Sequence, residues 1–146
     1  MRSLRVFVLL TDVGFIAYWL ATLLHLVPPS YLFKDYAEPL VVAWNWSFFP
    51  LDLAVSATGL ASLWLQRRGD PRWPAWTLVS LTLTSCSGLM AIAFWGMRGD
   101  FELSWWLPNG FLLLYPLFFF RRVMAAWIGG GDGARHADPR RGGASP

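Results

Sequence analysis

Four long apolar runs, separated by short polar segments, dominate the chain. They cover about residues 5–28, 41–65, 75–97 and 103–125. A helix needs about 20 mainly apolar residues to cross the ~30 Å hydrocarbon core of a bilayer, and each run is close to that length. The pattern predicts an all-α fold: an integral membrane four-helix bundle whose successive helices run up and down, antiparallel to one another.

The two ends of the chain need separate interpretation. The first run is interpreted as a retained helix rather than a cleaved signal peptide, because Asp12 interrupts its apolar centre and no Ala-x-Ala-like site follows before Pro28. Residues 129–146 are rich in Gly, Pro and Arg and cannot bury enough apolar surface to fold. We therefore expect a transmembrane domain over residues 1–128, followed by a disordered cytoplasmic tail over residues 129–146.

The basic residues are distributed unequally between the two sides that this topology creates. If both termini lie inside, the outer side holds only two of the 12 Lys and Arg residues, Lys34 and Arg98. The inner side then holds Arg2, Arg5, Arg67, Arg68, Arg72, Arg121, Arg122, Arg135, Arg140 and Arg141. Positive charge in short loops marks the cytoplasmic side. The distribution predicts a multi-pass protein of the cell membrane, with both termini in the cytoplasm.

Composition excludes several classes of function. Hydrophobic side chains make up 55% of the chain, charged ones 14%, and the mean hydropathy is +0.42, which is too apolar for a soluble domain. Cytoplasmic basic anchors beside anionic headgroups explain the net charge of +3, so we expect membrane lipid rather than nucleic acid as a partner. Cys86 has no second cysteine, which excludes a disulfide or a CxxC metal site within one copy. No metal or cofactor is expected.

Asp52 lies near the middle of the second apolar run. A charged residue there costs roughly 2.5–3.5 kcal/mol on insertion scales, so Asp52 should face a protein interior or a wet cavity rather than lipid. Helical spacing places Asn45, Ser56 and Gly59 on the same face. Pro50 removes a backbone donor just before Asp52, which predicts a kink at this point.

A second acid, Asp12, interrupts the first run nearer its cytoplasmic end. It lies at the margin of the polar face of that helix, where it either lines a cavity or extends toward the inner headgroups. Because Asp52 is deeper and shares its face with Asn45 and Ser56, we expect Asp52→Leu to change function or assembly more than Asp12→Leu.

Polar residues on three helices suggest a binding pocket in the outer half of the bundle. His25, Asn45, Asp52 and Asn109 would otherwise need separate partners in hydrocarbon, so we expect them to line one void with His25 near its rim. Four indoles at interfacial depth are expected around its mouth: Trp44, Trp46, Trp105 and Trp106. A buried acid beside Trp rings is also a candidate proton donor to an apolar substrate, with Asp52 as the candidate catalytic residue.

Three classes of function are consistent with these residues. The first is a structural or accessory membrane protein, alone or with a partner membrane protein, in which the polar groups form interhelical hydrogen bonds of about 0.6 kcal/mol each. The second is a lipid or hydrophobic small-molecule binding protein or an isomerase-like enzyme. The third is a small transporter. A deep pocket reaching Asp52 favours the second class, and a closed bundle in which Asp52 bonds to a neighbouring helix favours the first.

Three short segments resemble the bacterial YvaD-like family of small membrane proteins. They are TDVGF at residues 11–15, LFKDY at 32–36 and AWNWSF at 43–48, and the resemblance covers about residues 5–125. That family is functionally uncharacterised. The resemblance implies four helices and leaves the activity open.

Two other families are similar at fewer positions. The EXPERA superfamily, the four-helix fold of emopamil-binding sterol isomerase, has an acid on its second helix, where this chain has Asp52 in place of the usual Glu. Its late helix has prolines and a basic end, to which Pro108-Asn109, Pro116 and Arg121 are similar. Small multidrug resistance transporters also have four helices and an acid in the first, to which Asp12 is similar. The members that insert in both orientations carry little of the charge bias seen here.

Overall fold

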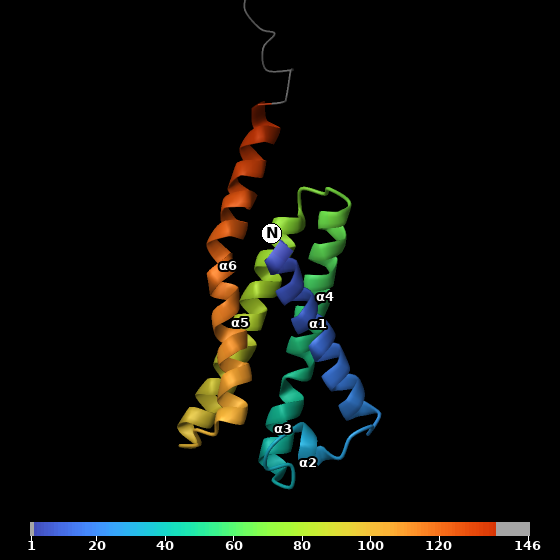
Figure 1. The fold of residues 1–146 in the computed structure, drawn as a ribbon, viewed down its shortest axis with the longest axis vertical. Helices are drawn as coiled ribbons and strands as arrows, with labels where there is room; N and C mark the ends of the chain where they lie inside the picture. The colour runs from blue at the N-terminus through green and yellow to red at the C-terminus, as the bar shows by residue number, and fades with distance from the viewer. Residues whose placement is uncertain (1, 137–146) are drawn as a thin grey trace, which may run out of the picture.

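The structure is a computed structural model that describes residues 2–136. Those residues contain helices and no strands, which agrees with the predicted all-α class. The helices are α1 (Arg2–Leu23), α2 (Pro29–Leu32), α3 (Pro39–Ser47), α4 (Phe49–Arg67), α5 (Trp73–Met97) and α6 (Leu103–His136). Figure 1 shows four long helical columns, of which α3 and α4 together form the second.

Four helical segments are long and apolar enough to cross a membrane. They are Arg2–Leu23, Pro39–Arg67, Trp73–Met97 and Leu103–Gly129, with 22, 29, 25 and 27 residues. Each exceeds or approaches the ~20 residues that a spanning helix requires. The four predicted apolar runs therefore each correspond to one helical column.

The columns pack in chain order, α1 on α4, α4 on α5 and α5 on α6. At one end lie the start of α1 and the turn between α4 and α5, and we call this the terminal end (Figure 1). At the other lie α2, the start of α3 and the turn between α5 and α6, and we call this the loop end (Figure 1). The helix α6 continues past the other helices at the terminal end.

The second column is interrupted at Phe48, between α3 and α4. The Phe48 N–H donates to the Asn45 carbonyl at 3.1 Å, a tighter turn than an α-helix makes. Pro50 has no N–H to donate, so the regular ladder cannot pass through this point. It resumes where the Asp52 N–H donates to the Phe48 carbonyl at 2.8 Å. The predicted kink beside Asp52 is present.

The first helix ends at Leu23, earlier than the predicted boundary at residue 28. The Leu26 N–H donates to the Ala21 carbonyl at 3.0 Å and the His25 N–H to the Thr22 carbonyl at 3.4 Å. This pair of bonds is a Schellman motif, which requires a left-handed residue after the helix. His25 takes that conformation with φ of 52°, although Gly is the usual residue there.

The last helix ends later than predicted, at His136 rather than at residue 125. Extending a formed helix closes one backbone hydrogen bond for each residue fixed, which is easier than starting a new one. Of the segment predicted to be a disordered tail, residues 129–136 therefore continue α6, and residues 137–146 lie outside the described part of the chain.

The buried apolar side chains form separate clusters toward the two ends. At the terminal end, Leu4 and Val8 of α1 pack with Tyr115, Phe119 and Val123 of α6 and with Leu81 of α5. Toward the loop end the clusters are mainly aromatic and contain Trp19, Phe33, Phe48 and Trp95. Trp19, Phe33 and Phe48 of these clusters line the cavity described below.

Gly88 allows α5 and α6 to approach closely. A Cβ at this position would lie 2.6 Å from the Asn109 carbonyl oxygen and 2.6 Å from the Leu113 backbone N. Small residues allow such close backbone contact between apolar helices. The contact fixes Asn109 at the same depth as the middle of α5.

Candidate functional site

A cavity of about 730 Å³ lies in the half of the bundle toward the loop end. All six helices or the segments next to them contribute to its lining. Its inner part reaches Asp52 on α4 and Ser87 on α5, and its outer part is bounded by Lys34 and Glu102 in the connecting segments. Ligand pockets commonly have volumes of about 300–1,000 Å³, so the space suits a small molecule or part of a lipid.

Asp52 forms the polar floor of the cavity and is only 4% exposed. Its Oδ2 accepts a hydrogen bond from the Trp19 Nε1–H at 3.0 Å, and its Oδ1 accepts one from the Ser87 hydroxyl at 3.1 Å. The carboxyl group therefore connects α1, α4 and α5. Two donors on a buried carboxyl are what make its burial tolerable and fix its orientation.

Asn45 lies on α3, nearer the loop end than Asp52, and is 7% exposed. The Tyr18 hydroxyl donates to its Oδ1 at 2.9 Å. Its buried Nδ2 has no hydrogen-bond acceptor among the described residues. Both Tyr18 and Asn45 line the cavity.

Asn109 lines the cavity from α6. Its Nδ2 donates to the Trp105 carbonyl at 2.7 Å, one turn earlier in the helix. That bond uses the side chain to bridge its own backbone near Pro108, where the helical ladder lacks a donor. Its role differs from that of Asn45, because its amide nitrogen already has an acceptor.

Aromatic rings form much of the cavity wall. Trp44 stacks on Phe94 with ring centroids 4.1 Å apart, and Trp105 stacks on Trp95 with centroids 6.0 Å apart. Phe48, at the break between α3 and α4, packs edge-on to Trp44 at 4.9 Å. Trp44, Phe48 and Trp105 are therefore each held by a second ring, which fixes this part of the wall without a ligand.

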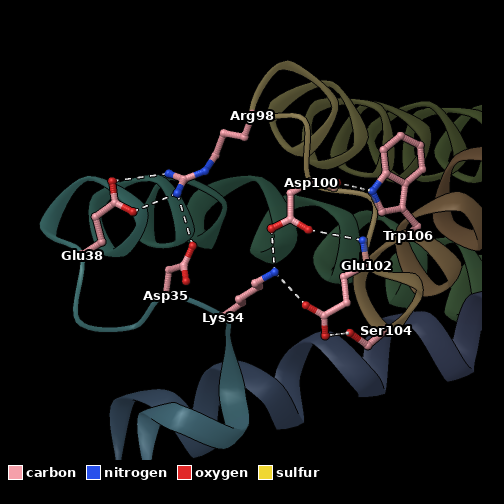
Figure 2. Close-up of polar contacts among 8 residues, drawn as sticks. All are labelled: Lys34, Asp35, Glu38, Arg98, Asp100, Glu102, Ser104 and Trp106. Atoms are coloured by element: carbon pink, nitrogen blue, oxygen red, sulfur yellow. Dashed lines mark hydrogen bonds and ion pairs between the residues drawn. The ribbon is translucent and has the colours of Figure 1, made fainter.

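Ion pairs between two connecting segments close the loop end beside the cavity (Figure 2). The Lys34 ammonium contacts Asp100 at 2.6 Å and Glu102 at 2.7 Å. The Arg98 guanidinium contacts Glu38 at 3.0 Å and Asp35 at 3.3 Å. We call these six residues the loop-end ion-pair cluster.

The charge on Lys34 changes the acidity of its partners. Its hydrogen bonds hold the pKa of Asp100 and of Glu102 below their ordinary values, because they stabilise the charged carboxylates. The same contacts raise the pKa of Lys34. All three groups are therefore charged at neutral pH, and the connection between the two segments is ionic.

The structure brings together most of the residues expected at one pocket. Asn45, Asp52 and Asn109 line one cavity, as do two of the predicted indoles, Trp44 and Trp105. Binding of a ligand by these residues stays a prediction.

Three residues need correction. His25 is exposed in the turn after α1 and does not line the cavity, because the helix ends before it reaches the rim. Trp46 is 38% exposed, packs on Trp19 and Phe49, and does not line the cavity. Trp106 also lies outside the lining, with its Nε1–H donated to the Asp100 carbonyl at 2.7 Å (Figure 2).

The partners that Asp52 and Asn45 find on other helices were not predicted from the sequence. Tyr18 and Trp19 each hydrogen-bond a polar residue of the second column, and Ser87 bonds to Asp52 from α5. Two adjacent residues with polar tips, Tyr18 and Trp19, were the available signal. It did not specify which acceptors they would meet.

Asp12 is fully buried and lies outside the cavity lining. Neither of its carboxyl oxygens has a hydrogen-bond partner among residues 2–136, and the Ser56 hydroxyl bonds instead to its backbone carbonyl at 3.2 Å. The alternative in which Asp12 extends toward a surface is therefore wrong. Within the described residues, no group of three or more His, Cys, Asp or Glu side chains is placed to hold a metal ion.

Comparison with known proteins places this architecture in a family. A family model described as a family of unknown function (DUF5360) matches residues 4–128. This chain belongs to the DUF5360 family. It is 52% identical over 124 residues to the uncharacterised protein YvaD of Bacillus subtilis (strain 168), covering 85% of this chain and 93% of that protein. The predicted YvaD-like resemblance is confirmed, and no solved structure matches.

The DUF5360 match includes every residue that lines the cavity. Neither the family description nor the name of the relative states an activity. The function of the DUF5360 fold is therefore argued from the geometry of the cavity.

Proposed function

We propose that this DUF5360 protein is an integral membrane protein, with both termini in the cytoplasm, that binds a lipid or another hydrophobic small molecule in the cavity near its loop end. The observation that carries the proposal is a cavity of about 730 Å³ that reaches the buried Asp52 between walls of aromatic rings. Pockets that are mainly apolar with a few convergent polar groups are typical of small-molecule sites.

The charge distribution supports the orientation. Five arginines lie near the terminal end, in the first turns of α1 and around the turn between α4 and α5: Arg2, Arg5, Arg67, Arg68 and Arg72. The two basic residues of the loop end are both paired with acids in the ion-pair cluster. The excess of arginines at the terminal end favours the cytoplasmic side for that end, and the cavity would then lie in the outer leaflet.

The packing order supports access from the bilayer. Because α1 packs on α4, α4 on α5 and α5 on α6, the helices α1 and α6 form the two edges of the arrangement. At the terminal end these edges meet, where the Thr11 hydroxyl bonds to the Tyr115 hydroxyl at 3.1 Å. Nearer the loop end both edges line the cavity, through Phe15 and Tyr18 on α1 and Leu112 on α6. An acyl chain is therefore expected to enter between α1 and α6.

Asp52 meets both the criterion for a structural residue and the criterion for a binding residue. Its two hydrogen bonds to neighbouring helices are the geometry expected of a structural residue, and its position at the floor of a cavity is the geometry expected of a binding residue. These roles are compatible, because the bonds orient the carboxyl group without filling the space above it. The cavity is what favours binding over a purely structural role.

Photocrosslinking tests the proposal. The protein in lipid nanodiscs is irradiated with a hydrocarbon probe that carries a diazirine, and the modified peptides are identified by mass spectrometry. We expect labels around Phe15 and Leu112 that are lost in Ala91→Phe, which fills the cavity from α5. Met90→Phe is the matched control, because Met90 is 51% exposed on the same helix. Labels spread over the lipid-facing surface and unchanged in Ala91→Phe would contradict binding in the cavity.

A further inference from the structure

The loop-end ion-pair cluster beside the cavity carries more negative than positive charge. Its two cations are Lys34 and Arg98, and its four carboxylates are Asp35, Glu38, Asp100 and Glu102. These six are the only Lys, Arg, Asp and Glu residues within 24–48 and 97–109, so two negative charges remain in excess at this end. An excess of one sign of charge around a cleft attracts ligands of the opposite sign.

Glu102 is the charged group best placed to contact a ligand in the outer part of the cavity. Both Glu102 and Lys34 line the cavity, and the Glu102 side chain is 50% exposed against 30% for Lys34. The Glu102 oxygens contact the Lys34 ammonium and the Ser104 hydroxyl (Figure 2). A carboxylate can accept about four hydrogen bonds, so these contacts leave capacity for another donor or cation.

From this distribution of charge we propose that the bound molecule is a hydrophobic cation, an apolar compound with one amine or quaternary ammonium group, and that Glu102 contacts that group in the outer part of the cavity. The inference rests on the proposed function and specifies the chemistry of the ligand.

Aromatic rings near Glu102 favour the same class of ligand. Trp105 lies one helical turn after Glu102, where its N–H donates to the Glu102 carbonyl at 3.1 Å, and both residues line the cavity. The faces of indole rings attract ammonium groups, and aromatic walls are a common means of binding quaternary ammonium compounds. The neighbouring Trp95 ring already attracts cations of the protein, with the Lys34 ammonium 5.8 Å and the Arg98 guanidinium 5.6 Å from its centroid.

The position of Glu102 avoids placing a charge in an apolar space. Because its side chain is half exposed, an ammonium group beside it keeps part of its hydration, whereas full burial of a charge is costly. The apolar chain of the ligand then extends along Phe15 and Leu112, between α1 and α6. An anion at this position would face the excess of carboxylates or would have to displace one from Lys34.

Four probes that differ only in their end group test the inference. They share one aliphatic chain with a diazirine and end in a trimethylammonium, a carboxylate, a hydroxyl or a methyl group. In phosphatidylcholine nanodiscs, labelling of the cavity peptides is divided by the labelling that remains in Ala91→Phe, which corrects for unequal partitioning of the probes into the bilayer. We expect this ratio to be about fivefold higher for trimethylammonium than for the hydroxyl, the combined effect of one partly exposed ion contact and one cation–π contact. The carboxylate probe should give the lowest ratio.

Two matched variants connect the preference to Glu102. Glu102→Gln removes the charge and keeps the shape, so the ratio for trimethylammonium should fall to about that for the hydroxyl. The ratios for the hydroxyl and methyl probes should not change, which shows that the cavity is intact. Glu38→Gln is the control, because it removes the same charge from the same cluster, whereas Glu38 pairs with Arg98 and does not line the cavity. This variant should retain most of the preference.

The outcomes separate the two proposals. Equal ratios for all four probes, or a higher ratio for the carboxylate or for a neutral probe, would overturn the inference and leave binding of hydrophobic molecules intact. An equal loss of preference in Glu38→Gln and Glu102→Gln would overturn the contact with Glu102. If no probe labels the cavity, the proposed function itself is wrong.

Discussion

The carboxyl group of Asp12 on α1 packs directly against the backbone of Gly59 on α4. A Cβ at position 59 would overlap both carboxyl oxygens of Asp12, and no hydrogen bond from the described residues compensates for the burial of that group. The backbone contact beside it, from the Ser56 hydroxyl to the Asp12 carbonyl, holds the two helices at this distance. A side chain at residue 59 would therefore force the Asp12 carboxyl group out of its present position.

Gly59→Ala is predicted to reduce the free energy of unfolding by about 1–3 kcal/mol, the usual cost of overpacking a closely packed contact. Thermal unfolding in detergent measures the change. Gly14→Ala is the control, because no atom lies within 4 Å of a Cβ at Gly14 and Ala is the better helix former. Asp12→Ala combined with Gly59→Ala should recover most of the lost stability. A Gly59→Ala protein as stable as Gly14→Ala would contradict the close contact.

Replacement of the two buried acids by Ala is predicted to affect stability differently. Asp52→Ala leaves the Trp19 indole and the Ser87 hydroxyl as buried donors without an acceptor, at about 1–3 kcal/mol each. Asp12→Ala breaks no hydrogen bond of its side chain and removes a buried polar group without a partner, so its unfolding temperature should be unchanged or higher. The sequence-based ranking of Asp52→Leu as more damaging than Asp12→Leu stays a prediction in the same direction. Greater destabilisation by Asp12→Ala would reverse it.

Lys34→Met is predicted to loosen the loop end. Spin labels at Tyr31→Cys and Leu103→Cys, introduced into Cys86→Ser protein, report the separation of the two connecting segments. At pH 7 their distance distribution should broaden in Lys34→Met, because Asp100 and Glu102 lose their shared cation. Arg72→Met is the matched control, since Arg72 forms an ion pair with Asp70 at the opposite end of the bundle.

The same ion pairs predict that the distance between these two spin labels depends on pH in the protein that retains Lys34. Lys34 holds the pKa of Asp100 and of Glu102 below their ordinary values, which are about 4. The stabilisation from a carboxyl with a lowered pKa is complete above its ordinary pKa and is lost as the pH falls through the lowered value. The distribution should stay narrow from pH 7 to pH 5 and broaden only below about pH 4. Broadening near pH 6 would show that other groups control the loop end.

The proposed orientation predicts a difference in chemical access between the two ends. In Cys86→Ser protein, a membrane-impermeant thiol reagent applied to intact cells should label Asp35→Cys and should label Gly131→Cys only after permeabilisation. Removal of Cys86 is required because the native thiol is exposed on α5. Labelling of both positions from outside, or of Gly131→Cys alone, would contradict cytoplasmic termini.

Some features of this protein follow from the sequence because they depend on local periodicity. The four apolar runs specify four long helices, because each run is long and apolar enough to cross a membrane, where a helix satisfies its own backbone hydrogen bonds. The spacing of Asn45 and Asp52 places both on one face, and Pro50 specifies a break between them, because the period of a helix and the missing donor of proline do not depend on the rest of the fold. The membership of the family was likewise visible in short segments.

The tertiary structure decided which residues meet across helices. Nothing local in the sequence pairs Trp19 with Asp52, or Gly59 with Asp12, because those contacts depend on how α1 rotates and tilts against α4. His25 was placed at the pocket by extrapolating the first helix to residue 28, whereas a Schellman turn ends that helix at Leu23 and leaves His25 exposed. The ion pairs of Lys34 and Arg98 join residues at least 60 positions apart in the chain, and only the packing of four columns brings such segments together.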